Sequence, residues 1–437
     1  MTHRKLPDLE RFILPERRSH VLTNNERKPL TISLQTITPI FGGGFKAAEL
    51  DDVDIIRIPA IRGHLRFWWR ALYGQGKDLY EREKKLWGGV NSNQSGSRSP
   101  IDVRIEGMNK LRSHENDNII RQELYALWPA KMENIYPRYA PGLQFTLKLL
   151  VPGECISEIK NTLRAWILFG GYGSRTRRGV GSLTVVDNCA EWLPRNASRE
   201  ALVSLFGIDI LAPTERAADD LPQLGGAFLL AGANHKPGRQ VWQEALKWLR
   251  EFRQGTQYKA RKSGPPGDHR PSISNWPEAD KLRQLSTPPA GGWSHPPRYD
   301  ATMAWPRAGF GLPINGQFQR QKRGGGVYHE PKDFKLHWEK SDQPYKRLAS
   351  PVIVKAMPLA NNMFIPIALW LNRAYPEGGQ VVLEGDDSTP RRSAAPFDRL
   401  KSPTDQAIFP PLATAPNLRE VFQLWLINTY HLQQVAP

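Results

Sequence analysis

Apolar and polar residues follow two different periods along the N-terminal half of the chain. Every second residue from Leu30 to Leu34 is apolar, which predicts a half-buried strand over residues 30–37. The apolar residues of segment 61–73 instead recur every three or four positions, which predicts a helix. The same two periods predict further strands over residues 101–105, 143–151 and 180–186 and a second helix over residues 156–169.

This order of elements predicts the fold class α+β. Strand, helix, strand, strand, helix, strand is the split βαβ or ferredoxin-like (RRM-like) arrangement, in which two helices cover one face of an antiparallel sheet. We expect residues 1–195 to form one such domain. We expect residues 196–437 to form a second, more decorated copy, although no clean internal repeat is visible. The later segments are strands over 227–231, 351–356, 363–371 and 380–383 and helices over 241–252 and 417–430.

A proline-rich, basic stretch interrupts the second half. Ten of the fifty residues from Gly264 to Pro313 are proline, a density that argues against regular helix and central strand. Residues 255–350 carry 16 Lys and Arg against 8 Asp and Glu. We therefore expect an irregular, basic, insertion-rich surface in this part of the chain.

Composition narrows the classes of partner. The 437 residues have a net charge of +17, with 40% hydrophobic and 10% aromatic residues. This is too rich in core-forming side chains for a disordered basic tail, and the charge attracts polyanions, with nucleic acid first because aromatic rings can stack on bases. The two cysteines form neither a disulfide framework nor a zinc pattern. Without an apolar signal segment or membrane span, we expect a cytoplasmic protein.

The predicted first helix carries a row of arginines. Arg62, Arg66 and Arg70 lie four residues apart, so their like charges share one face and repel unless an anion or an acidic partner lies across from them. One interpretation is a helix that presents guanidinium groups to phosphates, assisted by free amides near its start. The other is a solvated basic face. The candidate RNA-binding residues of this segment are Arg62, Gly63, His64, Arg66, Trp69 and Arg70.

A second motif, the Gly-Arg loop of residues 170–181, follows the second helix. Five glycines in twelve residues permit close backbone approach, and three arginines bring charge to the amides, a combination that suits a polyphosphate backbone. It has no Walker ending, and a purely structural turn is the alternative. The candidate RNA-binding residues of this loop are Gly170, Gly171, Gly173, Arg175, Arg177, Arg178 and Gly179.

Together these motifs resemble the RAMP superfamily of CRISPR effector proteins, and within it the first-subunit family of type III-B Cmr complexes. The resemblance rests on Thr38–Gly43, on Ile58–Gly63 running into Leu65–Leu72, and on the Gly-Arg loop. Weaker matches in the second half are Arg270–Ser272, Trp276–Glu278, Gly309–Ile314 and Arg347–Pro351. Arg307 and Arg347 adjoin such segments and join the candidates.

The resemblance implies two fused ferredoxin-like RAMP domains in a multi-subunit ribonucleoprotein. It implies contact with the 3′ part of a guide RNA and with target RNA, other RAMP subunits as partners, and no cofactor. Members of this family help capture target RNA and are not the subunits credited with cutting it. We therefore predict a non-catalytic RNA-binding subunit for antiviral defence, in which Trp69 or Tyr172 stacks on a base.

Two other functions stay open. Asp51, Asp52 and Asp54 could hold magnesium near a phosphate, as in a metal-dependent endoribonuclease, or they could form a solvated turn. His64 could act as a general acid or base, as a phosphate donor or as a packing residue. A structural adaptor that docks acidic partner subunits is the third possibility.

Overall fold

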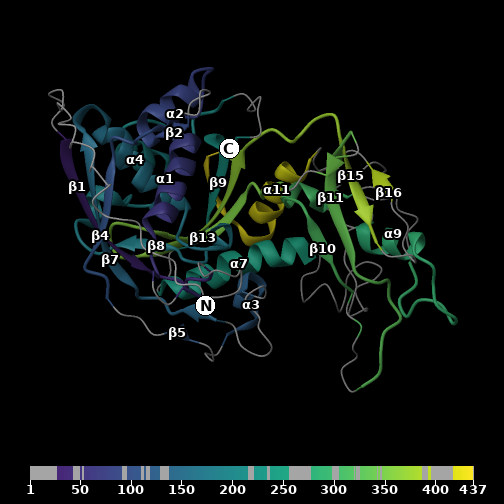
Figure 1. Cartoon of the computed structure of the whole chain (residues 1–437). Helices are drawn as coiled ribbons and strands as arrows, with labels where there is room; N and C mark the ends of the chain where they lie inside the picture. The colour runs from purple at the N-terminus through teal and green to yellow at the C-terminus, as the bar shows by residue number, and fades with distance from the viewer. Residues whose placement is uncertain are drawn as a thin grey trace, which may run out of the picture.

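The structure is a computed structural model of the chain, and its helices and antiparallel sheets follow one another in layers (Figure 1). It describes residues 27–42, 50–51, 54–90, 96–109, 113–114, 119–127, 137–214, 221–233, 237–254, 277–297, 305–318, 320, 325–341, 343–344, 347–385, 392–394 and 417–436. Mixed helix and antiparallel sheet is the α+β class expected from the sequence.

The first sheet has the strand order β4-β7-β1-β8, and all its pairs are antiparallel. Alternate residues of β1 are buried, and Ile32 and Leu34 lie opposite Leu147 and Phe145 of β7. The predicted elements of this half are therefore present within a few residues of their expected bounds. They are β1 (Arg27–Thr36), α1 (Ile58–Tyr73), β4 (Asp102–Glu106), β7 (Gln144–Pro152), α4 (Ile156–Phe169) and β8 (Leu183–Val185).

The second sheet repeats the same order by position in the chain, β13-β14-β9-β17, again with antiparallel pairs. Its edge strand β17 was not expected from the sequence, and the predicted strand over residues 380–383 lies in another sheet. The elements of this unit are β9 (Gln223–Ala231), α7 (Gly238–Gln254), β13 (Val352–Pro358), β14 (Phe364–Asn372), α11 (Leu418–Tyr430) and β17 (Gln433–Ala436).

Layering explains the burial of the helices. Helices α1 and α4 cover the first sheet and also pack against β9 and β13 of the second sheet, so they lie between the two sheets. Helices α7 and α11 cover the other face of the second sheet. Figure 1 shows this succession from β1 through α4 and α1 to β9 and α11.

A third sheet combines strands from the stretch predicted to be irregular, residues 255–350, with the predicted strand over residues 380–383. Its order is β10-β11-β15-β16, with β12 beside β11, and it has a separate apolar core. The expectation that prolines exclude helix here is wrong for α9, because Pro277 is the first residue of that helix, where its missing amide costs nothing. The elements are α9 (Pro277–Leu285), β10 (Ile314–Gly316), β11 (Phe334–Lys340), β12 (Gln343–Pro344), β15 (Gln380–Glu384) and β16 (Arg392–Ala394).

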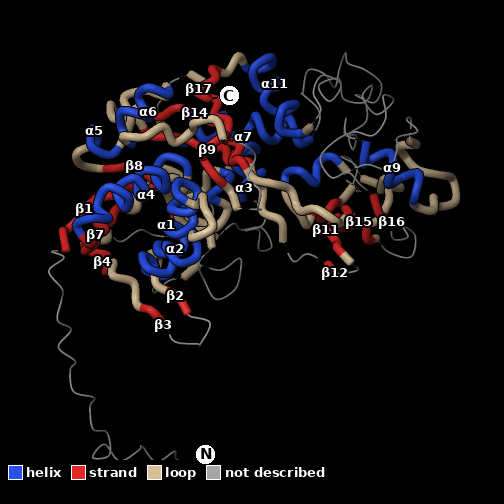
Figure 2. Tube along the Cα trace, turned by 90° about the horizontal axis from the view of Figure 1, so that it is seen from above, coloured by secondary structure: helices blue, strands red, loops and turns tan. Residues whose placement is uncertain are grey.

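The first and third sheets lie at opposite ends of the molecule, with β9 and β14 between them (Figure 2). Within the described residues, no helix is both long enough and apolar enough to cross a membrane. Smaller elements complete the chain. They are α2 (Leu79–Trp87), β2 (Gly89–Val90), β3 (Gly96–Ser97), β5 (Ser113–His114), α3 (Arg121–Leu127), β6 (Arg138–Tyr139), η3 (Gly153–Cys155), η4 (Thr176–Arg178), α5 (Cys189–Trp192), α6 (Arg199–Phe206) and η5 (Pro306–Phe310).

Candidate nucleic-acid interface

We call the first sheet with α1 and α4 the first unit, and the second sheet with α7 and α11 the second unit. The Gly-Arg loop lies at the junction of these two units, where η4 packs against β13. Its backbone is fixed from the first unit: Ser174 donates to the Phe41 carbonyl at 2.8 Å, and Gly181 donates to the Pro39 carbonyl at 2.7 Å. The Tyr172 amide donates to the Gly181 carbonyl at 2.8 Å, which closes the loop on itself. These amides are therefore occupied inside the protein and do not form the open phosphate cradle that the sequence suggested.

Close packing explains the glycines of the loop. A Cβ atom at Gly170 would lie 2.4 Å from Nε1 of Trp68, and one at Gly171 would lie 2.7 Å from the Gly181 carbonyl oxygen. Gly173 and Gly179 adopt positive φ values of 91° and 71°. Glycine is thus required here by the fold. Gly63 on α1, by contrast, is exposed, and a Cβ there would meet nothing within 4 Å.

The three arginines of the loop point in different directions. Arg175 is exposed and has a left-handed backbone, with φ of 61°. Arg177 donates to the Ser350 carbonyl, and its guanidinium carbon lies 5.6 Å from the centre of the Phe67 ring. Arg178 lies over the Tyr125 ring of α3 at 5.3 Å. Arg175 is therefore the loop arginine most open to a ligand.

Three further arginines approach the loop from the second unit. Arg253 lies near the end of α7, exposed Arg347 precedes β13, and buried Arg373 follows β14 and donates to the Ala349 carbonyl at 2.6 Å. We call the six residues the arginine cluster. Its members are Arg175, Arg177, Arg178, Arg253, Arg347 and Arg373.

Like charges act on one another inside this cluster. Burial first, and then the charge of Arg373, lowers the pKa of Arg177 to about 10. Burial also lowers the pKa of Arg178 to about 10, with Arg253, Arg175 and Arg177 adding to the effect against the opposing influence of Tyr125. Arg177 and Arg178 nevertheless stay charged at neutral pH.

Carboxylates are scarce around the cluster. Within the described part of the chain, no Asp or Glu forms an ion pair with Arg175, Arg177, Arg178, Arg253 or Arg347. The groups that stabilise these guanidinium charges are instead a backbone carbonyl and aromatic rings. Such a concentration of positive charge favours an anionic ligand.

The arginine row of α1 has its partners on neighbouring segments of the first unit. Arg66 and Arg70 approach one carboxylate oxygen of Glu83 on α2, at 2.7 and 3.8 Å. Arg62 donates to the Ile101 carbonyl at 2.6 Å. The acidic partner that like charges at this spacing require is thus part of the protein, because Glu83 receives both Arg66 and Arg70.

The aromatic residues proposed to stack on bases are buried. Trp69 is 1% exposed and donates through its indole to Glu158 at 2.6 Å. Tyr172 is 4% exposed, and its hydroxyl accepts from the Arg57 amide at 2.8 Å. Neither ring offers a face to a base, so the predicted stacking does not fit this structure. The reason is that Trp69 lies on the buried side of α1, and Tyr172 lies in a loop that closes on itself.

His64 is also enclosed. Its ring stacks against Trp166 at 6.2 Å and meets the edge of Tyr172 at 5.8 Å. Burial lowers the pKa of His64 to about 4, so the imidazole is neutral at pH 7. A packing role fits these contacts, whereas a cationic phosphate donor does not.

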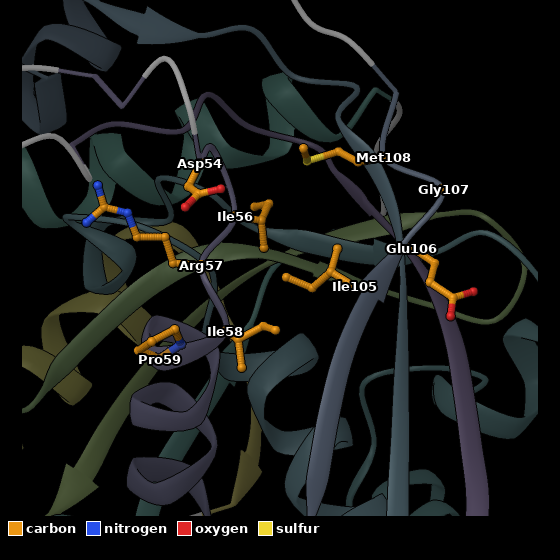
Figure 3. Close-up of a pocket in the computed structure, with 9 residues that line it drawn as sticks. All are labelled: Asp54, Ile56, Arg57, Ile58, Pro59, Ile105, Glu106, Gly107 and Met108. Carbon is orange, nitrogen blue, oxygen red and sulfur yellow. The ribbon is translucent and has the colours of Figure 1, made fainter. Parts of the chain in front are cut away.

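The acidic segment before α1 borders a pocket of about 500 Å³ (Figure 3). Asp51 pairs with Arg57 and accepts from the Asp54 amide at 2.9 Å, while Asp52 lies outside the described residues. In Figure 3, Asp54 and Glu106 lie on opposite sides of the pocket. The lining residues are Asp54, Ile56, Arg57, Ile58, Pro59, Ile105, Glu106, Gly107 and Met108. Over the described residues, no three His, Cys, Asp or Glu side chains gather as a metal site would require.

Arg307 lies beside the third sheet and does not join the arginine cluster. Its Nε lies 3.3 Å from a carboxylate oxygen of buried Glu278 on α9, so it stabilises the layer beside the third sheet. Arg347 does join the arginine cluster. Arg253, Arg373 and Tyr125 were not predicted from the sequence, because their approach to the loop depends on the packing of α3, α7 and β14 and leaves no local motif.

Comparison with known proteins agrees with part of this description. Residues 33–184 match the family model of the RAMP superfamily. The chain is 32% identical over 150 residues to the CRISPR system Cmr subunit Cmr1-1 of Pyrococcus furiosus, an alignment that covers 32% of this chain and 43% of that relative. The predicted resemblance is thus confirmed over the first unit.

Two solved structures are similar at low identity. The apo crystal structure of Cmr1 from Pyrococcus furiosus aligns with a TM-score of 0.47 and 14% identity, covering 94% of this chain and 99% of that one. A chain from the type III-B Cmr-beta complex bound to cognate target RNA aligns with a TM-score of 0.44 and 11% identity, covering 81% of this chain and 97% of that one.

Proposed function

We propose that the protein is an RNA-binding, non-catalytic subunit of a type III-B-like CRISPR ribonucleoprotein, a proposal supported by the match of residues 33–184 to the family model of the RAMP superfamily. Its ligands are the 3′ region of a guide RNA and a target RNA, and its protein partners are other RAMP subunits. The similarity to a Cmr subunit supports this assignment, with an aligned segment that spans 43% of that relative.

We further propose that the chain consists of two ferredoxin-like domains, residues 1–195 and 196–437. The support is the shared strand order of β4-β7-β1-β8 and β13-β14-β9-β17, each with two helices inserted in corresponding places. The third sheet is then an insertion that leaves the second domain after α7 and again after β14.

The arginine cluster carries the proposal of RNA binding. Bringing guanidinium groups together raises the free energy of the folded protein unless an anion compensates, and the described carboxylates do not approach five of them. A phosphate backbone supplies closely spaced negative charges and accepts hydrogen bonds from arginine in pairs. Such contacts read backbone and shape, so base pairing between guide and target selects the sequence.

Binding is favoured over cleavage by the acidic segment. A metal-dependent ribonuclease needs carboxylates that converge on a metal ion. Asp51 is instead held by Arg57, and Glu106 across the pocket from Asp54 pairs with Lys148 at 2.6 Å. This geometry gives no specific support to an endoribonuclease.

The exposed members of the cluster provide the test. We expect R175A combined with R347A to weaken binding of labelled single-stranded RNA about tenfold, equally for unrelated sequences. The slope of log K against log salt should fall in magnitude by about 1.4, since each lost phosphate contact removes about 0.7. Neither side chain packs in the core, so the fold should persist.

R195A is the matched control, because Arg195 is also exposed but lies outside the cluster. It should leave both the affinity and the salt slope unchanged. Equal binding by the double variant and the wild type, with both folded, would contradict the proposal. Cleavage of the RNA in magnesium that is abolished by D52A would instead support the endoribonuclease.

A further inference from the structure

A lysine is buried at the junction of the two units. Lys355 lies in the middle of β13 and is 0% exposed. It shares its face of the strand with Ile353 and Met357, which belong to the core that also contains α4, whereas Val354 and Ala356 face α7. Burial disfavours the charged form and lowers the pKa of Lys355 to about 7, and an amine in this apolar setting needs a specific partner.

Backbone carbonyls of the other unit are that partner. Nζ of Lys355 donates to the Ile167 carbonyl at 2.8 Å and to the Gly170 carbonyl at 2.7 Å. The last carbonyls of a helix have no partner within it, and the end of the helix dipole favours a positive charge. Lys355 therefore caps the C-terminus of α4 from the second unit.

Gly170 is also the first residue of the Gly-Arg loop, and the space around it is full. Its Cβ position lies within 2.6 Å of the Trp166 carbonyl oxygen as well as 2.4 Å from Trp68. Because Gly170 is so confined, the position of its carbonyl also fixes the direction of the backbone that follows it. The hydrogen bond from Lys355 thus sets where the loop leaves α4, five residues before exposed Arg175.

From these contacts we infer that Lys355 is a positioning residue for the arginine cluster, holding the Gly-Arg loop in the orientation that binds RNA. This inference rests on the proposed function. It adds a residue that does not touch the ligand and that couples the second unit to a loop of the first. The cluster needs this coupling because Arg253, Arg347 and Arg373 come from the second unit.

The test is a double-mutant cycle on the full-length chain with labelled single-stranded RNA. Lys355→Met keeps an unbranched, apolar side chain that fits beside Ile353 and Met357 but donates no hydrogen bond. We expect it to weaken RNA binding about tenfold in the wild type. In R175A the further loss should be only about twofold, because the arginine that Lys355 positions is already absent. Additive losses, or full affinity of folded K355M, would overturn the inference.

Ile353→Ala is the matched control. Ile353 is buried on the same face of the same strand but bonds to no loop carbonyl, so its truncation lowers stability without moving Gly170. At a temperature where both variants are folded, I353A should bind RNA as the wild type does. Equal weakening by I353A and K355M would show that general loosening of the junction is responsible, and the inference would fail.

Lys355→Gln is the second variant if K355M does not fold. Its amide is one bond shorter and can reach one of the two carbonyls, so we expect an affinity between those of K355M and the wild type, and again less than additive loss with R175A. Full additivity would refute the inference. The two proposals fail separately, since R175A with R347A tests RNA binding and K355M tests only the coupling.

Discussion

At the scale of single residues, burial decides what a side chain can do. His64 and Trp69 of α1 and Tyr172 of the Gly-Arg loop have residue types suited to RNA binding, yet all three pack against neighbouring side chains inside the protein. Arg175 and Arg347 are exposed and remain open to a ligand. Residue type therefore supports the resemblance to the RAMP superfamily over residues 33–184, whereas exposure selects the arginines that we expect to contact RNA.

The buried imidazole makes a prediction for acid stability. His64 has a folded pKa of about 4 against 6.5 when exposed, so between these values the unfolded chain binds the extra proton. The free energy of unfolding should therefore fall as the pH falls, with this residue contributing a loss of about 2 kcal/mol between pH 7 and 5. Denaturant unfolding at several pH values would measure it.

His64→Phe should flatten that pH dependence, because phenylalanine keeps the ring contacts with Trp166 and Tyr172 but does not titrate. His431→Asn is the control, since His431 is exposed and asparagine tolerates its left-handed backbone. If the wild-type and H64F curves remain parallel from pH 7 to 5, His64 becomes an imidazolium as readily in the folded protein as in the unfolded chain, which would contradict the prediction.

At the scale of elements, the α1 and α2 pair accounts for the arginine row. Glu83 is buried on α2 and receives Arg66 and Arg70, which are 40% and 35% exposed. RNA contact by this row stays a prediction. The geometry favours a structural role, in which two guanidinium groups attach α2 to α1.

Glu83→Gln separates these roles. Loss of the shared charge should lower the free energy of unfolding by about 1 kcal/mol, a modest value because both arginines are partly solvated. Thermal unfolding measures this change. We expect the RNA affinity and its salt slope to stay unchanged, because both guanidinium groups face α2. A steeper slope would mean that the freed arginines bind phosphates.

Local periodicity predicted the elements that have a clear buried face. Strand β1 and helices α1 and α4 were expected within a few residues, since alternation and helical spacing are properties of the segment itself. Of the third sheet only β15 was expected, as the strand over residues 380–383, and the sheet was missed because its strands come from distant segments, as in the pairing of Lys335 with Glu384. Helix α9 was missed because ten prolines outweighed the permitted position of one, Pro277.

The candidate site was predictable only in part for the same reason. The Gly-Arg loop is a local motif, so its glycines and Arg175 could be identified from the sequence. The contributions of Arg253 and Arg373 depend on how the second unit docks. A lysine in the apolar strand 352–358 was a visible signal, because a buried charge demands a partner, but the partner lies 185 residues earlier in the chain.

At the scale of the whole molecule, one turn of the Gly-Arg loop joins the two units, in addition to the packing of α1 and α4 against β9 and β13. The indole of Trp242 on α7 donates to the Arg178 carbonyl at 2.6 Å, and the Thr38 hydroxyl of the first unit donates to the Gly179 carbonyl at 2.6 Å. Elements of both units thus meet at one short turn of the loop. We expect the two units to unfold together for this reason.

Gly179→Ala tests that contact, with Gly207→Ala as its control. Both glycines have φ near 70°, so alanine carries a similar backbone strain at each, about 1 kcal/mol. A Cβ at Gly207 meets nothing within 4 Å, whereas one at Gly179 lies 2.5 Å from Cδ1 of Trp242 and 3.0 Å from the Val354 carbonyl oxygen. The excess loss for G179A therefore measures the junction alone.

We expect that excess to be about 2 kcal/mol in the free energy of unfolding, because neither a strand backbone nor a buried indole can yield freely. Calorimetry should show one unfolding transition for the wild type and for G207A. In G179A the transition should broaden or divide, because the displaced turn weakens the packing between the two units. Equal losses in the free energy of unfolding of the two variants would mean that this turn does not stabilise the contact between the units. Other contacts would then hold the arginine cluster together.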